Sequence, residues 1–357
     1  MIADPKIPAS RFTGGAEILS CLPHGNGHIN DTFRVETKER IFILQRINQY
    51  VFKKPYEVME NVLGVTEWIR RKLEAEGLDP ARRVLHVIPA DTGDPFWVDA
   101  EGEYWRAYDL IKDAVCYERA ENEEIFCESA AAFGNFQRQL IDYPVEKLHE
   151  TIIDFHNTPV RFGQFKEAAE RDPLGRLKEV RREADFLFER EKLAHRLKDA
   201  AAEGRLPIRA AHNDTKLNNV MMDRRTGRGI CVLDLDTVMP GFSVMDFGDA
   251  IRFGASTADE DEPDTDKVHL DLHLYEVYAR AFVRGCDGAL TQDELSMLPD
   301  GAMVITYEQA LRFLADYLEG DIYYKTNRPG QNLDRARTQI RLLQEMEQNR
   351  RRMEQVI

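Results

Sequence analysis

The sequence predicts an α+β chain whose N-terminal part is rich in strands and whose remainder is mainly helical. Short runs of alternating apolar and polar residues dominate the first hundred residues or so, and apolar residues at helical spacing dominate from about residue 112 onward. The chain has 357 residues, a length that suits two domains or one domain built of two lobes. Its apolar fraction of 43% is sufficient for a genuine hydrophobic core.

The strand-rich part contains two predicted hairpins and one long helix. The predicted strand segments cover 16–22, 31–37, 40–47, 83–89 and 95–111. The second and third segments form one hairpin, and the last segment forms another by itself. The long helix is predicted between them, because Pro55 suits a first helical turn and Gly77 suits a stop.

The remaining sequence predicts helices and one acidic loop. Apolar residues recur at helical spacing over 128–141, 173–204, 311–324 and 337–357. The acidic run ADEDEPDTD is expected to be a solvated loop, because blocks of like charge repel one another.

Composition excludes several classes of function. The formal net charge of −15 argues against a general nucleic-acid binder, because neutralising phosphates requires a basic face. The five cysteines form no CxxC pair, so we expect reduced thiols in a cytoplasmic protein and no metal cluster. The first residues lack the apolar core of a signal peptide, and no apolar run approaches the roughly 20 residues that a membrane span needs.

The loop sequence HNDTKLNN, followed by a hairpin and the apolar run ICVLDLD, predicts phosphoryl transfer. Asp214 can accept the proton of an attacking hydroxyl, and the oxygens of Asn219 and Asp234 can hold Mg²⁺. Lys216 follows the base by two residues and can reach the γ-phosphate of a nucleotide as charge moves onto its oxygens. Spacing and strand context agree, so these four residues are the strongest candidates in the chain.

The same residues resemble a known family. An HxDxxxxN loop followed by an apolar strand ending in Asp is the pattern of protein kinases and of the aminoglycoside phosphotransferase and choline kinase superfamily. Together with PHGNGHIND, FHNTPVRF, LDLDTVMPG, DFGDAIRFGAST and RFLADYLEGDIYY, the chain resembles bacterial N-acetylhexosamine 1-kinases from about residue 15 to about residue 348.

This resemblance implies a bilobal, protein-kinase-like fold. The N-lobe would cover 1–108 with an antiparallel sheet and one long helix, the hinge 109–115, and the larger helical C-lobe 116–357. The implied activity is phosphorylation of the anomeric C1 hydroxyl of GlcNAc and GalNAc, with ATP as co-substrate and Mg²⁺ as cofactor. The expected partners are these small molecules alone, with no nucleic acid or membrane, and the expected state is a monomer or weak dimer.

The resemblance also assigns roles to individual residues. Asp214 corresponds to the catalytic base beside Lys216, and Asn219 and Asp234 correspond to the metal ligands. The implied sugar-binding residues, besides Asp214, are His28, Arg312 and Tyr323. The implied nucleotide-binding residues are Gly25, Asn26, Gly27 and Gln45. Taken singly, a Gly-rich turn, one His, one helical Arg and one Tyr would have ordinary structural explanations.

Two positions require a choice between readings. Asp246 begins a DFG triplet, but it lies 32 residues after Asp214, too far for the strand end of the catalytic hairpin, so we interpret it as a helix-start or loop-anchoring acid. Asp236, two residues from Asp234 on the same predicted strand face, could be a second metal ligand or a loop anchor, and we favour the anchor. Gln45 occupies the place of the phosphate-pairing lysine of protein kinases, so the phosphate charge must rest on Mg²⁺, Lys216 and backbone N–H groups.

Three alternatives remain open. A non-catalytic nucleotide or sugar sensor of the same fold would lack Asp214, Asn219 or Asp234, and all three are present. A metal-dependent hydrolase would use His212 and the nearby acids, but it would need further histidines close by. Within the kinases, the acceptor could be an aminoglycoside, a choline-like alcohol or another sugar. A cationic acceptor would need a strongly acidic pocket, which Arg312 and His28 do not suit.

Overall fold

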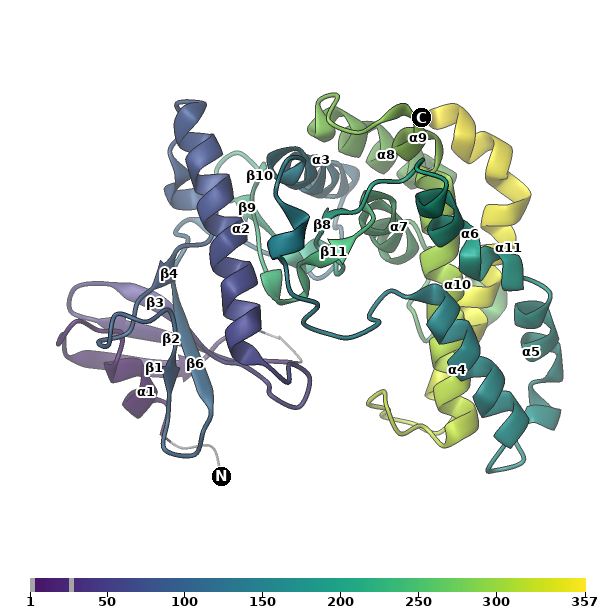
Figure 1. Ribbon diagram of the computed structural model, residues 1–357, viewed down its shortest axis with the longest axis horizontal. Coiled ribbons are helices and arrows are strands. Elements are labelled where there is room, and N and C mark those ends of the chain that lie inside the picture. The colour runs from purple at the N-terminus through teal and green to yellow at the C-terminus, as the bar shows by residue number, and fades with distance from the viewer. Residues whose placement is uncertain (1–3, 26–28) are drawn as a thin grey trace. The chain divides into compact units, whose positions relative to one another are not determined.

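The protein, described here by a computed structural model that covers residues 4–25 and 29–357, divides into two compact units. The first comprises Met1–Val115, Asp142–Ile153 and Met221–Met239. The second comprises Cys116–Ile141, Asp154–Val220 and Pro240–Ile357. Strands are concentrated in the first unit and helices in the second, which confirms the predicted α+β class (Figure 1). The lobe boundaries expected from sequence, 1–108 and 116–357, remain a prediction, because two later segments group with the first unit.

The first unit is built on an antiparallel sheet. Its strands, in spatial order, are β1 (Ile18–Pro23), β2 (Asp31–Thr37), β3 (Ile41–Arg46), β6 (Tyr104–Asp109) and β4 (Val87–Ile88), with β5 (Trp97–Val98) also paired to β6. Alternate residues such as Phe33, Val35 and Leu44 point into one core cluster that also buries Trp105. Both predicted hairpins are therefore confirmed, whereas the strand expected over 83–89 shrinks to two residues.

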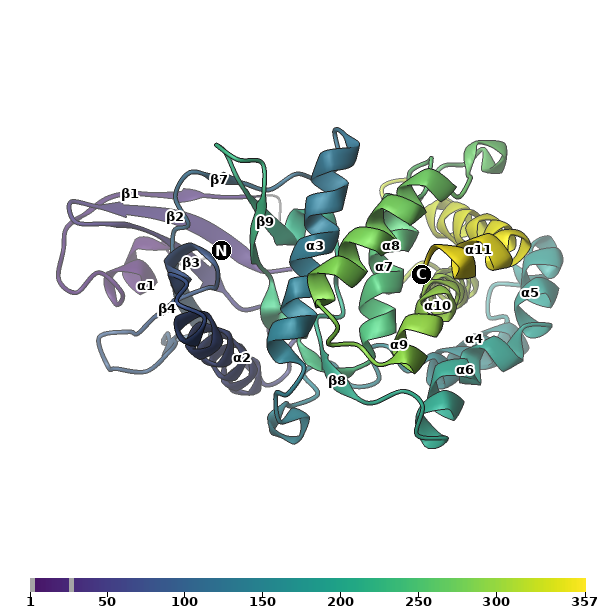
Figure 2. The same ribbon diagram turned by 90° about the horizontal axis from the view of Figure 1, so that it is seen from above.

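The long helix α2 (Pro55–Ala75) follows β3, as predicted, and lies alongside the sheet (Figures 1 and 2). Pro55 occupies its first position, where a missing N–H has no cost. Gly77, with φ of +73°, ends it in the left-handed conformation that glycine adopts without strain. Two short helical elements, α1 (Lys6–Ser10) and η1 (Pro80–Arg82), complete this part of the unit.

A second, small sheet carries one of the predicted functional acids. It has the order β10 (Gly229–Val232), β9 (Val220–Asp223), β7 (Ala114–Val115). The β10 strand ends at Val232, and the chain then turns into the short 3₁₀ helix η5 (Leu235–Thr237). Asp234 and Asp236 consequently do not share a strand face, which corrects the sequence-based expectation. Asp234 has φ of +54°, so extended geometry cannot continue through it.

The second unit is a bundle of helices around α10. Its helices are α3 (Glu123–Leu140), α4 (Thr158–Arg171), α5 (Arg181–Phe188), α6 (Glu191–Ala202), α7 (Ser243–Gly254), α8 (Leu272–Cys286), α9 (Gln292–Ser296), α10 (Leu298–Glu319) and α11 (Gln331–Val356). The short strand β8 (Arg209–Ala211) precedes the HNDTKLNN loop, and β11 (Met239–Gly241) precedes α7. Helix α10 is buried on nearly all sides and packs against α4, α6, α7 and α11 (Figure 2).

Glycines allow a close contact between two helices of this unit, α7 and α10. A Cβ on Gly248 of α7 would lie 2.5 Å from the backbone of Gly301 in α10, and a Cβ on Gly301 would lie 2.0 Å from the carbonyl oxygen of Val244. No larger residue fits at either position without separating the helices. The contact matters for the site, because α7 and α10 carry several of its buried charges.

Two predicted helices differ from the structure. The segment 173–204 is broken into η3 (Leu177–Glu179), α5 and α6. The segment 311–324 is helical only to Glu319, because Gly320 and Asp321 have positive φ and end α10. Tyr323 therefore lies in a loop and not at the end of a helix. Sequence analysis also did not define α4, α7, α8 and α9 as separate helices.

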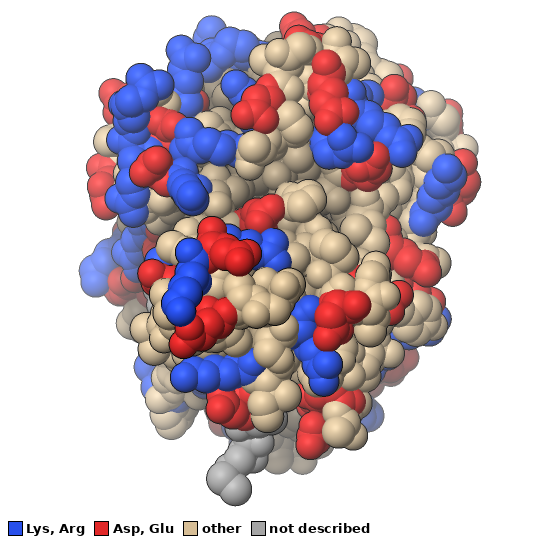
Figure 3. Space-filling view, turned by 90° about the vertical axis from the view of Figure 1, so that its left-hand side faces the viewer, with Lys and Arg blue, Asp and Glu red and all other residues tan. Residues whose placement is uncertain are grey.

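The surface and the cysteines agree with the compositional analysis. Basic and acidic side chains are interspersed over the face shown in Figure 3. All five cysteines, each within the described residues, are free thiols. No helix among residues 4–25 and 29–357 has the length and apolar character needed to span a membrane.

Candidate active site

The HNDTKLNN loop brings three of the predicted residues together. It leaves β8 at His212 and ends in the 3₁₀ turn η4 (Leu217–Asn219). Lys216 Nζ lies 2.8 Å from Asp214 Oδ1, and Asn219 Nδ2 donates to the Asp214 carbonyl oxygen at 2.8 Å and to Oδ2 at 3.2 Å. The Asp214 carboxylate is thus held from both sides, in a loop that is too short to rearrange freely.

Asp246 sets the backbone of this loop. Its carboxylate accepts from the backbone N–H of His212 at 2.7 Å and of Asn213 at 2.8 Å, and from Gln137 Nε2 at 2.5 Å. The side chain is buried in the first turn of α7, and burial raises the pKa of Asp246. These contacts agree with the interpretation of Asp246 as a loop-anchoring acid.

His212 is fully buried and braces the loop from below. Its ring lies edge-on to Phe133 and Phe136, with ring centroids 5.5 and 5.7 Å away. Its Nδ1 accepts from the backbone N–H of Asp214 at 3.3 Å. This environment argues against the metal-hydrolase alternative, in which His212 would be an accessible ligand.

A row of buried charges continues from Lys216 into α7. Asp249 accepts from the backbone N–H of Thr215 at 3.2 Å and pairs with Arg252 at 3.0 Å, and Arg252 also binds Glu260 at 2.6 Å. Burial alone would lower the pKa of Lys216, but the carboxylates of Asp214 and Asp249 outweigh it and raise that pKa. Lys216 therefore stays an ammonium group beside the predicted base.

Arg312 and Tyr323, both predicted to bind the acceptor, lie together in the second unit. The Arg312 guanidinium stands between two aromatic rings, 5.7 Å from the centroid of Phe155 and 5.6 Å from that of Tyr324. The guanidinium also interacts with Tyr323, a residue that is 70% exposed. The Tyr324 hydroxyl is buried and has no hydrogen-bond partner among residues 4–25 and 29–357, and burial raises its pKa to about 12. Stacked, half-buried donors of this kind suit a hydroxyl-rich ligand.

The loop that carries Tyr323 is organised by a buried acid. Asp316, in the last turn of α10, accepts from the backbone N–H of Ile322 at 2.9 Å, of Tyr323 at 2.7 Å and of Tyr324 at 3.0 Å. Asn332 of α11 donates to the same carboxylate at 2.8 Å. The position of Tyr323 is thus fixed by tertiary contacts rather than by helical geometry.

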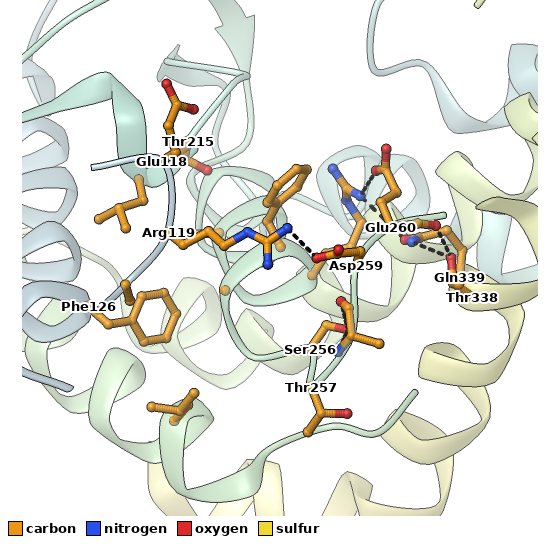
Figure 4. Close-up of a pocket in the computed structure, with 18 of the residues that line it drawn as sticks. Glu118, Arg119, Phe126, Thr215, Ser256, Thr257, Asp259, Glu260, Thr338 and Gln339 are labelled. Carbon is orange, nitrogen blue, oxygen red and sulfur yellow. Dashed lines mark hydrogen bonds and ion pairs between the residues drawn. The ribbon is translucent and has the colours of Figure 1, made fainter. Parts of the chain in front are cut away.

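A cavity of about 520 Å³ borders the catalytic loop within the second unit. Thr215 and Leu217 line it on one side, and α7, the following loop and α11 line it on others. In Figure 4, Arg119 and Asp259 point toward one another across it and form an ion pair of 2.6 Å. Its four carboxylates and three guanidinium groups nearly balance, so the cavity is not strongly acidic.

In the first unit, Asp234 and Asp236 have different surroundings. Asp234 is exposed at the start of η5. Asp236 is buried and receives both arms of Arg106 of β6, at 2.6 and 2.8 Å, as well as Asn30 Nδ2 at 2.8 Å. Burial alone would lower the pKa of Arg106, but the Asp236 carboxylate raises it. With both oxygens engaged, Asp236 fits the role of an anchor better than that of a metal ligand.

Asn219 and Asp234 have the donor chemistry that Mg²⁺ requires. Asn219 uses its amide nitrogen for hydrogen bonds, and its Oδ1 accepts none from the described residues. Carboxylate and amide oxygens are hard ligands, and Mg²⁺ commonly takes only one or two protein ligands beside substrate phosphates. No group of three or more His, Cys, Asp or Glu side chains gathers around a metal-sized space in the described part of the chain.

The nucleotide-binding predictions rest on the first unit. Gly25 has φ of +76°, a left-handed conformation that suits a tight turn. Asn26, Gly27 and His28 lie outside the described residues. Gln45 Oε1 accepts from Arg106 Nε at 3.1 Å, and Gln45 Nε2 donates to Thr32 at 3.1 Å. The place of the expected lysine is therefore part of a buried polar network.

Sequence analysis missed several charged residues that the structure places around these predicted ones. Arg106 was hidden because it stands in an alternating strand with no distinguishing pattern, and its partner Asp236 is 130 residues away. His156 and Glu308 form a buried pair at 2.7 Å, 152 residues apart. Arg252 and Asp249 have helical i, i+3 spacing, which is the one signal that could have revealed them.

Comparison with known proteins identifies a family over most of the chain. The family model described as "Phosphotransferase enzyme family" matches residues 20–285, well over half of the sequence.

Solved structures of similar fold extend over almost the whole chain. A microcompartment-associated aminopropanol kinase is 15% identical, with a TM-score of 0.57 and coverage of 98% of both chains. An aminoglycoside phosphotransferase from Alicyclobacillus acidocaldarius is 11% identical, with a TM-score of 0.61 and coverage of 99% of this chain and 98% of that chain. A choline kinase from Streptococcus pneumoniae is 12% identical, with a TM-score of 0.51 and coverage of 96% and 99%. Identities this low establish the fold alone, and the predicted kinase-like fold is confirmed.

Proposed function

Because the chain belongs to the phosphotransferase enzyme family, we propose that it is an ATP-dependent kinase that phosphorylates the anomeric hydroxyl of N-acetylhexosamines, GlcNAc or GalNAc. One observation carries this proposal. The second unit holds both the Asp214, Lys216 and Asn219 cluster and the stacked Arg312 with Tyr323, so a base and a set of sugar-suited donors occur in one compact unit.

The chemistry follows from the side chains. Asp214 accepts the proton of the C1 hydroxyl while that oxygen forms a bond to the γ-phosphorus, and the bond from the γ-phosphorus to the ADP oxygen breaks. Lys216, already an ammonium group beside Asp214, stabilises negative charge on the transferred phosphoryl oxygens. Asn219 and Asp234 would hold Mg²⁺, which when bound neutralises charge on the phosphates. Gly25, Asn26, Gly27 and Gln45 belong to the proposed nucleotide-binding residues.

The cavity beside the catalytic loop, which Arg312 and Tyr323 do not line, has nearly balanced charge and so offers a cationic acceptor no strongly acidic site. An aminoglycoside or amino alcohol carries ammonium groups, which gain most from unpaired carboxylates. Three of the four carboxylates in the cavity are already paired with arginines, Asp259 with Arg119, Glu260 with Arg252 and Asp261 with Arg328. Because this cavity borders the catalytic loop but is not lined by Arg312 or Tyr323, a kinase of another alcohol that binds there is the second candidate.

A substrate panel tests the proposal directly. ADP release should be measured with ATP and Mg²⁺ against GlcNAc, GalNAc, unmodified hexoses, choline, an amino alcohol and an aminoglycoside. We expect turnover with the N-acetylhexosamines and a product phosphorylated at C1 by NMR. Asp214→Asn, as the matched inactive variant, should lose roughly 10²-fold or more in kcat, the usual scale of positioned acid–base catalysis. If only the cationic alcohols are turned over, the proposed sugar kinase is wrong and the second candidate, a kinase of another alcohol, takes its place.

The acceptor residues give a second test. Arg312→Ala leaves an acceptor oxygen of the bound sugar unpaired, which costs about 1–3 kcal/mol, or roughly ten- to a hundred-fold in kcat/KM for the hexose. The KM for ATP should stay within a few-fold, and a thermal melt should exclude misfolding. A folded variant with unchanged sugar kinetics would mean that the acceptor binds elsewhere.

A further inference from the structure

A buried His–Glu pair holds the backbone immediately before Asp214. His156 precedes α4, its side chain is 10% exposed, and both of its ring nitrogens face acceptors. Nδ1 lies 2.7 Å from Glu308 Oε1, and Nε2 lies 3.0 Å from the carbonyl oxygen of Asn213. A carbonyl oxygen can only accept, so Nε2 must carry a proton. A carboxylate opposite Nδ1 favours a second proton there.

The surroundings of His156 favour a positive ring. Glu308 of α10 is fully buried and accepts a further hydrogen bond from Thr158 Oγ1 at 2.7 Å. Asp246 and Asp249 of α7 add negative charge near the ring, and Arg312 of α10 adds positive charge. Burial alone would lower the pKa of His156, but Glu308 outweighs it and the pKa is raised. The pKa of Glu308 is lowered, although burial opposes this, because His156 stabilises its anion.

The peptide that His156 holds has an uncommon conformation. Asn213 has φ of +63°, in the left-handed region that asparagine enters more readily than most residues with a side chain. Its N–H is bound by Asp246, and its C=O is bound by His156. The next residue is Asp214, whose carboxylate direction depends on the orientation of this peptide plane. A rotation of the plane would release the Asn213 carbonyl and move Asp214 away from Lys216.

We propose that His156 is a positioning residue, an imidazolium held by Glu308 that fixes the Asn213–Asp214 peptide and thereby aims the Asp214 carboxylate. The proposal rests on the proposed kinase function in so far as Asp214 is the base. The alternative is that His156 has only a structural role, in which it packs in the core and pairs with Glu308. In that case the hydrogen bond to Asn213 has no consequence for turnover.

A pair of amide substitutions separates the two hydrogen bonds of the ring. The amide nitrogen of Gln reaches the position of Nε2, and that of Asn reaches the position of Nδ1. His156→Gln should keep the contact to Asn213, and His156→Asn should keep the contact to Glu308. We expect His156→Asn to lose roughly 10- to 100-fold in kcat with an unchanged KM for ATP, and His156→Gln to recover to within a few-fold of the parent protein. Equal kcat values for the two variants would overturn the proposal.

Another His–Glu pair of the same geometry serves as the control. His269 Nδ1 lies 2.8 Å from Glu345 Oε1, but this ring is half-exposed and does not contact the catalytic loop. His269→Gln and His269→Asn should both leave kcat unchanged. Thermal melts of all four variants would distinguish a misdirected Asp214 carboxylate from a loss of the folded structure.

Hydrogen exchange tests the positioning without any acceptor. In the full-length protein, the amides of Asn213, Asp214 and Thr215 should exchange faster in His156→Asn than in His156→Gln. Ring ¹⁵N NMR at pH 7.5 should show His156 protonated at both nitrogens, and Glu308→Gln should remove one of those protons. If the panel finds no substrate, these two results still decide the proposal. A neutral His156 ring, or equal exchange in both variants, would overturn it even if the kinase activity is found.

Discussion

Two buried aspartates, one in each unit, hold the loops of the predicted functional acids by different means. Asp236 and Asp246 are both 1% exposed. Asp236, next but one to Asp234, is neutralised by the guanidinium of Arg106, which reaches it from β6. Asp246 instead accepts from neutral donors, the backbone N–H groups of His212 and Asn213 and the amide of Gln137.

The difference separates two structural tasks. A guanidinium supplies a full charge and two parallel hydrogen bonds, so the pair Arg106–Asp236 ties a strand of the main sheet to the turn after β10. A carboxylate facing successive backbone N–H groups instead fixes the local path of the chain, including the left-handed Asn213. Asp316 acts in the same way on the loop of Tyr323. Loss of Asp236 would leave the charge of Arg106 buried without a partner. Loss of Asp246 or Asp316 would leave backbone N–H groups without acceptors.

The largest expected effect on stability follows from Asp236→Ala. The substitution leaves Arg106 buried without its counter-charge, which should lower the free energy of unfolding by about 3–5 kcal/mol. Urea denaturation measures this change. The double variant Arg106→Met with Asp236→Leu should recover most of the stability, because an apolar pair has no charge to desolvate. A loss below about 1 kcal/mol in the single variant would show that water or another group reaches Arg106.

A smaller loss is expected for Asp246→Asn. One oxygen remains for a backbone N–H, but the new amide NH₂ faces another donor, so the expected cost is about 1–3 kcal/mol. The dependence of ATP turnover on Mg²⁺ concentration should be unchanged, because Asp246 is assigned no metal. A stable Asp246→Asn protein with weakened Mg²⁺ dependence would instead make this acid the metal ligand.

The smallest effect on stability, with a large effect on activity, is expected for Asp234→Asn. Asp234 is exposed, and asparagine tolerates the same left-handed conformation, so the free energy of unfolding should change by no more than about 0.5 kcal/mol. Turnover at fixed Mg²⁺ should fall by roughly 10²-fold or more, because the ligand loses its charge. Retained kcat at low Mg²⁺ would assign the metal to other oxygens.

Much of this molecule could be predicted from local sequence. Alternating residues predicted both hairpins of the main sheet, and Pro55 and Gly77 marked the limits of α2 to within two residues. The HNDTKLNN loop placed Asp214, Lys216 and Asn219 within contact, because residues two to five apart in a tight loop cannot separate. The same reasoning correctly favoured an anchoring role for Asp246, since its distance from Asp214 did not suit the catalytic strand end.

Only the tertiary structure decided what holds these loops in place. Arg106 and Asp236 are 130 residues apart, and His156 and Glu308 are 152 apart. Neither pair leaves a mark in periodicity, because a buried charge needs a partner in space and not at any fixed spacing. Helix α10 seemed to run on to Tyr323, yet it ends at Glu319, since Asp316 captures the N–H groups that follow. Local pattern thus predicted which residues carry the chemistry, and long-range hydrogen bonds of buried acids determined where those residues lie.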